Sequence, residues 1–435
     1  MLQTIINMFK IPDLKKKILF TALFLILYRL GSFIPTPGVN TEALRAFFAN
    51  ANQGGNTLFG LFDLFVGGNF ERASVFALGI MPYITASIVI QLLGSIIPYF
   101  EKLRKEGAEG QKKINQITRY GTVFIGIFNA IGMAIFLQHT EGVVSMNPAI
   151  FTFTTVISMI TGTMIILWIG EQITEHGIGN GVSLIIFAGI IARYPAGFLN
   201  MFEMIRSGNM GIITGLIILA IMIGVTAAVI LVTEATRKIN VQYPKRVIGR
   251  KTYGGQSTYI PLKVNTAGVI PIIFAQSVIM MPRTIATFFP DSPFYDVVLK
   301  MFSPGEFVYT VLYMAMIIFF AYFYTAIVMN PVEMAENMKK YGGFVHGTQP
   351  GKSTAKYINN ILTRITLPGA IFFAIVAVIP EFMMKWTQIP FYFGGTGLII
   401  IVGVALETLQ QIESHLVMRH YDGFMKKGKL RGRSR

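Results

Sequence analysis

The sequence predicts an all-α polytopic membrane protein with ten transmembrane helices. Composition is the first of three observations behind this prediction: hydrophobic residues make up 53% of the 435 residues, and the mean hydropathy is +0.58. Only 13% of the residues are charged, whereas a soluble domain contains about a quarter. The other two observations are the placement of the basic residues and an internal repeat. The chain has no cysteine, which excludes disulfides, cysteine–zinc sites and thiol nucleophiles.

Ten apolar stretches are long enough to cross a bilayer, which takes about 20 residues of helix. They cover approximately 18–36, 73–98, 119–138, 152–170, 182–199, 211–232, 264–288, 307–328, 365–384 and 392–413. The first follows Lys15-Lys16-Lys17, as a signal peptide would, but Tyr28-Arg29 occupies the place of a cleavage site. We therefore expect it to be a retained span.

The net charge of +16 is unevenly distributed along the chain. Lys and Arg gather in the N-terminal segment 1–17, in the loops after spans 2, 6 and 8, and in the tail 414–435. By the positive-inside rule, both termini and these loops are expected to be cytoplasmic.

A short apolar run at 58–66, between spans 1 and 2, cannot cross a bilayer. Gly67-Gly68 and the charged Glu71-Arg72 end it before span 2 begins. Backbone that enters a membrane and stops is tolerated only inside protein or beside a water-filled cavity. The run is expected to be held by apolar contact alone; a helix lying on the outer surface is the alternative.

Span 2 contains Pro82, which is expected to kink its helix. Ile80 and Ile84 are four residues apart and share a face of that helix.

Spans 2 and 7 match at an offset of 189 residues, which is the third observation. The matching pairs are Gly79 with Gly268, Pro82 with Pro271, and Ile84 with Ile273. Spans 5 and 10 both follow a glycine-rich turn and reach Leu-Ile-Ile, at 184–186 and 398–400. Five spans per half is an odd number, so the halves 18–199 and 211–413 have opposite orientation. Such inverted repeats place the functional path between the halves.

Two long loops are expected on the cytoplasmic side, at 233–263 and 330–364. The first interleaves aromatic residues with basic ones, and Gly254-Gly255 offers a hairpin turn. A basic finger that reaches RNA or an acidic protein surface is one interpretation. An ordinary positive-inside loop is the other.

The residues needed for catalysis or ion coupling are missing. The sequence has no HExxH or GxSxG motif and no carboxylate pair at mid-span, so no catalytic residue, cofactor or metal is expected. The glycines of 177–181 lack the context of a nucleotide-binding loop and are interpreted as a tight turn. The mid-span polar residues are neutral: Gln91, Asn129, Asn265 and Gln276. Their neutrality favours a passive path over a coupled transporter.

From end to end, the chain resembles the SecY family, the central subunits of the bacterial protein-conducting channel. The matching segments are LYRLGSFIPTPGV (27–39), RASVFALGIMPYITASIVIQLL (72–93), GEQITEHGIGNG (170–181), QSTYIPLKVNTAGVIP (256–271), NPVEMAENMKKYGGFV (330–345), TAKYINNILTR (354–364) and PFYFGGTGL (390–398). The resemblance implies a channel in the cytoplasmic membrane that moves unfolded secretory polypeptides across it and releases transmembrane segments laterally into lipid. Two five-span halves would close around a central pore.

The resemblance also implies roles for particular residues. The pore ring would consist of Ile80, Ile84, Val182, Ile186, Ile273 and Ile400. The plug would be the run 58–66 with its glycine hinge: Leu58, Phe59, Leu61, Phe62, Leu64, Phe65, Gly67 and Gly68. Thr85, Gln91, Asn265 and Gln276 would lie along a lateral gate, although Gln91 and Gln276 could simply join neighbouring helices.

The partners implied are SecE-like and SecG-like membrane subunits, the SecA motor ATPase, the ribosome, secretory preproteins with their signal sequences, and lipid. SecA or the ribosome would dock on Lys245, Arg246, Arg250, Lys251, Gln349 and Lys352. Gln349 stands where the family generally has arginine, so a guanidinium is missing there. The alternatives are an inverted-repeat secondary transporter for a small solute and an intramembrane enzyme, which would lack its catalytic set.

Overall fold

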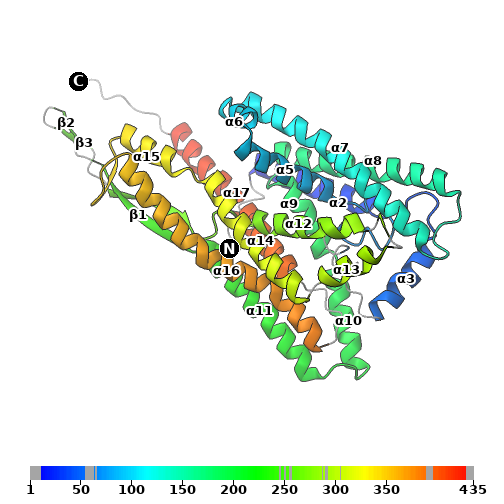
Figure 1. Cartoon of the computed structure of the whole chain (residues 1–435). Coiled ribbons are helices and arrows are strands. Elements are labelled where there is room, and N and C mark those ends of the chain that lie inside the picture. Colours follow the sequence, from blue (N-terminus) through cyan, green and yellow to red (C-terminus); the bar gives the residue numbers. More distant parts are fainter. Residues whose placement is uncertain are drawn as a thin grey trace. The chain divides into compact units, whose positions relative to one another are not determined.

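The computed structural model describes residues 11–53, 63, 66–243, 246–248, 251–253, 257–286, 288–289, 292–303, 305–387 and 395–427 (Figure 1). The chain divides into two compact units. Unit 1 takes in the described residues of Met1–Phe198, Thr284–Tyr295 and Val404–Arg435, and unit 2 those of Leu199–Arg283 and Asp296–Gly403.

Unit 1 is helical. It contains α2 (Pro12–Gly31), α3 (Thr41–Gln53), α5 (Met81–Ile96), α6 (Pro98–Lys105), α7 (Ala108–His139), α8 (Pro148–His176) and α9 (Gly181–Ile191). Helix α7 lies between α5 and α8, and α8 also packs on α2 and α9 (Figure 1). Four further helices each include a boundary between the units: α10 (Tyr194–Arg206), α12 (Ile270–Ala286), α13 (Pro293–Met301) and α17 (Gly395–Lys427).

Helices of spanning length confirm the polytopic membrane class. Among the described residues, seven are long and apolar enough to cross a bilayer, and α5 with α6 would make an eighth if the bent pair counts as one span. The other two predicted spans correspond to α12 and α2. Helix α12 has only 17 residues, and α2 has 20 residues but begins with Asp13 and three lysines.

Span 2 differs from its prediction in two ways. Residues 75–80 form turns, and helix begins only at Met81. The predicted kink at Pro82 is wrong because Pro82 lies in the first turn, where its missing N–H breaks no intrahelical bond. The bend, 97°, comes instead between α5 and α6, where Ile97 is extended ahead of Pro98.

The same local geometry recurs at the second member of the repeat. Helix α12 begins at Ile270, 189 residues after Met81, and its second residue is Pro271. Gly79 and Gly268, two residues before each helix, both adopt positive φ, at 56° and 63°. Glycine reaches that conformation without the steric cost that a β-carbon imposes.

Unit 2 combines helices with two small sheets. Its helices are α11 (Ile212–Glu234), α14 (Phe307–Val328), α15 (Pro331–Lys340) and α16 (Lys352–Thr387). Its strands are β1 (Thr236–Gln242), β2 (Arg246–Ile248), β3 (Lys251–Tyr253), β4 (Ser257–Lys263) and β5 (Phe344–Val345). The described strands belong to the two long loops.

The first long loop is a β-hairpin, as its turn chemistry suggested. Strands β1 and β4 pair antiparallel from Thr236 opposite Lys263 to Gln242 opposite Ser257, and β2 pairs with β3. The predicted position of the turn is wrong. Ile248 lies opposite Lys251, so the connection is 249–250, which, like 254–255, falls outside the described residues.

The two long loops fold together. Ile239 and Val241 point to one face of β1 and pack with Met338 of α15 and Ile358 of α16, and β5 adds a third strand beside β1. Burying each of these side chains stabilises the fold by about 1.5–3 kcal/mol. We call this assembly of β1, β4, β5, α15 and the start of α16 the hairpin module.

Candidate functional site

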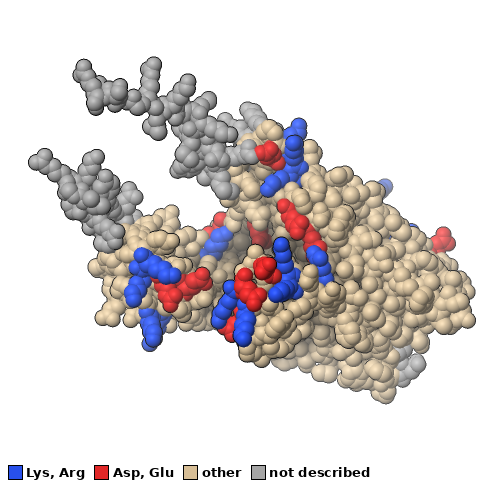
Figure 2. Space-filling model, turned by 90° about the horizontal axis from the view of Figure 1, so that it is seen from above, with Lys and Arg blue, Asp and Glu red and all other residues tan. Residues whose placement is uncertain are grey.

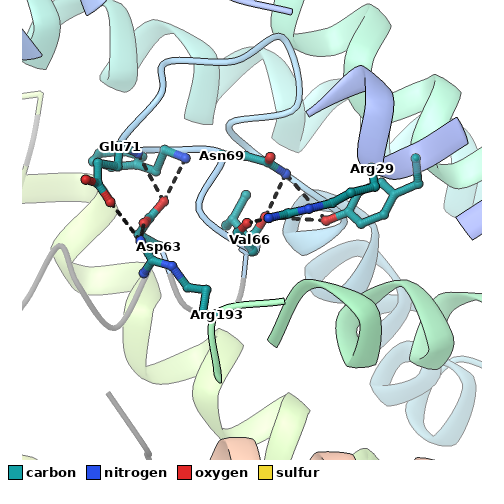
Figure 3. Close-up of polar contacts among 9 residues, drawn as sticks. Arg29, Asp63, Val66, Asn69, Glu71 and Arg193 are labelled. Carbon is teal, nitrogen blue, oxygen red and sulfur yellow. Dashed lines mark hydrogen bonds and ion pairs between the residues drawn. The ribbon is translucent and has the colours of Figure 1, made fainter. Parts of the chain in front are cut away.

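The described end of the short apolar run lies in a buried polar network in unit 1 (Figure 3). The Asp63 side chain is 3% exposed and forms an ion pair with Arg193, which follows α9. Arg193 also pairs with Glu71, with 2.8 Å between Nη2 and Oε2. One arginine therefore contacts two carboxylates that lie on either side of Gly67-Gly68.

Asp63 also organises the turn that comes after it. Its Oδ1 accepts hydrogen bonds from the backbone N–H of Phe70 (2.8 Å) and of Glu71 (3.0 Å). Aspartate commonly closes turns by accepting from backbone amides nearby in sequence. Burial raises the pKa of the Asp63 carboxyl, and Arg193 and the two amides oppose that shift.

A second set of contacts holds the backbone just before and within the glycine pair. Asn69 Nδ2 and the Tyr28 hydroxyl donate to the carbonyl of Val66, at 2.6 and 3.4 Å, and Arg29 Nη1 donates to that of Gly67 at 2.8 Å (Figure 3). Asn69 and Tyr28 are both buried. The Tyr28-Arg29 pair at the end of α2 thus fixes the chain after the run.

The glycine pair adopts a backbone that other residues rarely reach. Gly67 and Gly68 have φ of 75° and 85°. A β-carbon on Gly67 would lie 2.7 Å from the α-carbon of Gly189 in α9, and one on Gly68 would lie 3.4 Å from Nε of Arg193. The chain passes against α9 at a distance that only glycine permits.

These contacts correct the prediction that the run is held by apolar contact alone. The six apolar plug residues fall outside the described residues: Leu58, Phe59, Leu61, Phe62, Leu64 and Phe65. Of the run itself, the structure describes Asp63 and Val66, and both are only 2% exposed. The described end is therefore buried, which argues against a helix lying on the outer surface.

The predicted pore-ring residues occupy equivalent positions in the repeat. Ile84 and Ile273 are each the fourth residue of their helix, α5 and α12, and Ile186 and Ile400 are each the sixth, in α9 and α17. All four are at most 6% exposed. Ile80 is buried at the start of α5, and Val182 of α9 is half-buried. Their assembly into one ring stays a prediction.

The predicted gate residues make local contacts. Thr85 Oγ1 donates to the Met81 carbonyl (3.1 Å), and Gln91 Nε2 donates to Ser87 Oγ (2.9 Å), both within α5. Gln276 is buried in α12, and Asn265 lines a cavity of about 20 Å³ in unit 2 with Gly268 and Pro271. That volume suits one water molecule. The gate itself stays a prediction.

The predicted partner residues are only partly described. Lys245 and Arg250 fall outside the described residues, and only the backbone of Arg246 and Lys251 is described, in β2 and β3. Gln349 and Lys352 are exposed on the hairpin module. In the view of Figure 2, blue Lys and Arg side chains lie beside red Asp and Glu side chains.

Two side chains that sequence reasoning missed add to the surface of the hairpin module. Lys238 Nζ lies 4.6 Å from the centre of the exposed Tyr259 ring on the neighbouring strand. Their pairing depends on the β1–β4 register, which the sequence did not reveal. Among the described residues, no group of three or more His, Cys, Asp or Glu could hold a metal ion.

Spanning helices and a repeated helix start define a polytopic membrane protein with an internal repeat. The family model described as SecY matches residues 74–409. The protein translocase subunit SecY of Aquifex aeolicus is 46% identical over 426 residues, covering 97% of this chain and 98% of that protein. The Escherichia coli K12 subunit is 45% identical, covering 97% and 96%. The chain belongs to the SecY family.

Solved structures show the same fold at lower sequence identity. The structure of a protein-conducting channel aligns with a TM-score of 0.67 at 18% identity, covering 94% of this chain and 96% of that one. Sec61 in a canine ribosome–channel complex aligns with a TM-score of 0.63 at 17% identity, with the same coverage.

Proposed function

We propose that this chain forms the channel of a protein translocase in the cytoplasmic membrane. It moves unfolded secretory polypeptides across the membrane and releases transmembrane segments sideways into lipid. Full-length similarity carries this proposal: proteins named protein translocase subunit SecY are 46% and 45% identical over 97% of the chain. The same similarity favours a protein-conducting channel over a transporter for a small solute.

The channel is passive, and a partner supplies the energy. The mid-span polar residues are neutral amides, which cannot couple transport to protons. The energy would come from ATP hydrolysis by SecA or from chain elongation on the ribosome. Two similar folds, canine Sec61 and the yeast Ssh1 complex, are titled as ribosome complexes, the latter with a TM-score of 0.60. SecE-like and SecG-like subunits would brace the two halves.

The hairpin module is the surface we assign to SecA or the ribosome. Lys238, Lys339 and Lys352 are exposed on it. A β-carbon on Gly351 would lie 4.0 Å from Cδ of Lys339, so the lysine stem passes close to the loop that carries Gln349. Lys339 therefore supports partner binding near Gln349, the position at which the family generally has arginine. A lysine offers a point charge rather than the planar fork of a guanidinium.

The ring and the plug together seal the idle channel. Isoleucine side chains exclude ions by dewetting and make no sequence-specific bonds with a passing chain. One similar solved structure is of a SecY protein whose plug domain is described as stabilising the closed state of the translocation channel and maintaining a membrane seal. The buried seat of Asp63 and Val66 supports the same role for 58–66.

A stalled secretory chain tests the proposed function. Photo-crosslinking probes at Ile84, Ile186, Ile273 and Ile400 are expected to label the chain, because these residues line its path. A matched probe at Ile217, which is 53% exposed on α11, is expected to label lipid alone. Labelling of lipid alone from all five positions would contradict the channel.

A further inference from the structure

We propose that Thr21 and Gln411 are positioning residues for helix α9. Their side-chain oxygens hold the turn that precedes α9, and this fixes the direction of Val182 and Ile186, two members of the predicted pore ring. The inference rests on the proposed channel function. It gives a role to two polar side chains to which neither the hydrophobic pattern nor the resemblance to the family assigned one.

The turn between α8 and α9 has backbone amides that cannot be satisfied by a helix. It consists of residues 177–180, of which Gly177, Ile178 and Gly179 are buried. Gly179 has φ of 90°, so the backbone is irregular there. A buried N–H without an acceptor costs free energy comparable to a lost hydrogen bond. The acceptors for this turn must therefore come from elsewhere.

Two of these acceptors are side chains from distant parts of the sequence. Thr21 Oγ1 of α2 accepts from the N–H of Ile178 at 3.0 Å, across 157 positions. Gln411 Oε1 of α17 accepts from the N–H of Gly179 at 2.9 Å, across 232 positions. The first and the last of the described helices thus both bond to the same turn.

The other polar contacts of the turn are local. Asn180 Oδ1 caps α9 by accepting from the N–H of Ser183 at 3.2 Å. Thr174 Oγ1 near the end of α8 accepts from the N–H of Gly181 at 2.9 Å. These bonds shape the turn, whereas the bonds of Thr21 and Gln411 fix it to α2 and α17.

Apolar packing brings α2 and α17 to the turn. Leu14 of α2 and Ile178 are both 4% exposed and form a core with apolar residues from both helices: Ile11, Ile18, Ile412 and Leu416. The fit around the turn is tight. A β-carbon on Gly177 would lie 2.4 Å from Oγ1 of Thr21, and one on Gly179 would lie 3.2 Å from Oγ1 of Thr408. The two acceptors are therefore held in place by their surroundings.

The direction of α9 follows from the position of its first residue. Gly181 begins the helix, and a β-carbon on it would lie 1.9 Å from the Gly170 carbonyl oxygen of α8. Val182 and Ile186 come one and five residues later and share a face of the helix. Since a helix turns by about 100° per residue, slippage of the turn by one residue would direct both side chains elsewhere. Bonds that fix the turn therefore fix the direction of these two side chains.

The test removes one acceptor at a time with little change of shape. Thr21→Val replaces a hydroxyl by a methyl group, and Gln411→Met removes the amide oxygen at nearly equal length. Thr21→Ser and Gln411→Glu keep an acceptor and are the conservative variants. Thr122→Val is the matched control, because Thr122 is likewise buried and its hydroxyl donates within α7, to the Thr118 carbonyl at 2.8 Å.

The first readout is the photo-crosslink to a stalled secretory chain, in the full chain with its partner subunits. Labelling from a probe at Ile186 is divided by labelling from a probe at Ile84, which lies on α5 and follows a different turn. We expect Thr21→Val to lower this ratio about fivefold or more, because a buried amide loses its acceptor. Gln411→Met should lower it about threefold, since its bond is only partly buried. The conservative variants and Thr122→Val should keep the parental ratio.

Two results would overturn the positioning role. One is a parental ratio in both Thr21→Val and Gln411→Met. The other is a fall of labelling from Ile84 as large as that from Ile186, which would indicate a general loss of structure. Absence of labelling from both probes in the parent would instead contradict the channel, so the two failures are distinguishable.

Amide hydrogen exchange over 177–181 is a second measurement, and it needs no passing chain. Exchange should become faster in Thr21→Val and Gln411→Met and stay parental in Thr21→Ser and Gln411→Glu. Unchanged exchange in the first two variants would overturn the hold on the turn, whether or not the chain conducts polypeptides.

Discussion

Gly67 and Gly189 approach each other more closely than any other residue type would permit. A β-carbon on Gly67 would be 2.7 Å from the Gly189 α-carbon, and one on Gly189 would be 3.2 Å from the Gly67 α-carbon. This contact presses the glycine pair against α9 at the turn where Asp63 is held. At the scale of single residues, the close approach of Gly67 to α9 depends on the absence of two methyl groups.

Gly67→Ala is expected to destabilise the closed state. The new methyl group would clash with α9 backbone, which costs about 1–3 kcal/mol beyond the strain of positive φ. Gly142→Ala is the matched control, because Gly142 has φ of 73° and nothing within 4 Å of its β-carbon position. Thermal unfolding and idle ion conductance would be measured on both. Equal behaviour of the two variants would refute a tight contact at Gly67.

The hairpin module shows how elements separated in sequence fold as one. The alternation of β1 buries Ile239 and Val241 and exposes Lys238 and Asn240. The buried face meets α15 and α16 from the second long loop. The exposed face is then held rigid, because its other side is packed.

Leu262→Ala is expected to loosen the module. Leu262 of β4 is 0% exposed, and such truncations cost about 2–5 kcal/mol. Proteolysis between Gln242 and Ser257 should become faster, and SecA or ribosome affinity should fall. Thr258→Ala, at an exposed position near the other end of the same strand, serves as the control. The same protease resistance in both variants would show that the module does not depend on this core.

The whole molecule is expected to have one orientation, set by its basic loops. Since the chain has no cysteine, each introduced cysteine is unique. Ser207 and Ser353 are both exposed, and they lie on opposite sides in the ten-span topology. Ser207→Cys should be labelled from outside intact cells, and Ser353→Cys only after permeabilisation. The reverse pattern would invert the predicted topology.

Sequence information alone was sufficient for the class of the protein, the approximate positions of its spanning helices and the repeat. Apolar length and glycine–proline punctuation are local properties, which is why α5 and α12 begin 189 residues apart with Ile84 and Ile273 in the same turn. The break of the apolar run at Gly67-Gly68 was likewise predictable, since positive φ favours glycine wherever it occurs.

Contacts between distant residues became known only from the folded chain. The ion pair of Asp63 with Arg193 joins segments far apart in sequence, and nothing near Asp63 marks its partner. The sequence also did not predict that the two long loops pack against each other. Nor did it predict that the bend lies at Pro98 rather than at Pro82. Each depends on how separate segments pack or on where a helix begins, and a buried charge is stable only where packing brings its counter-charge within contact.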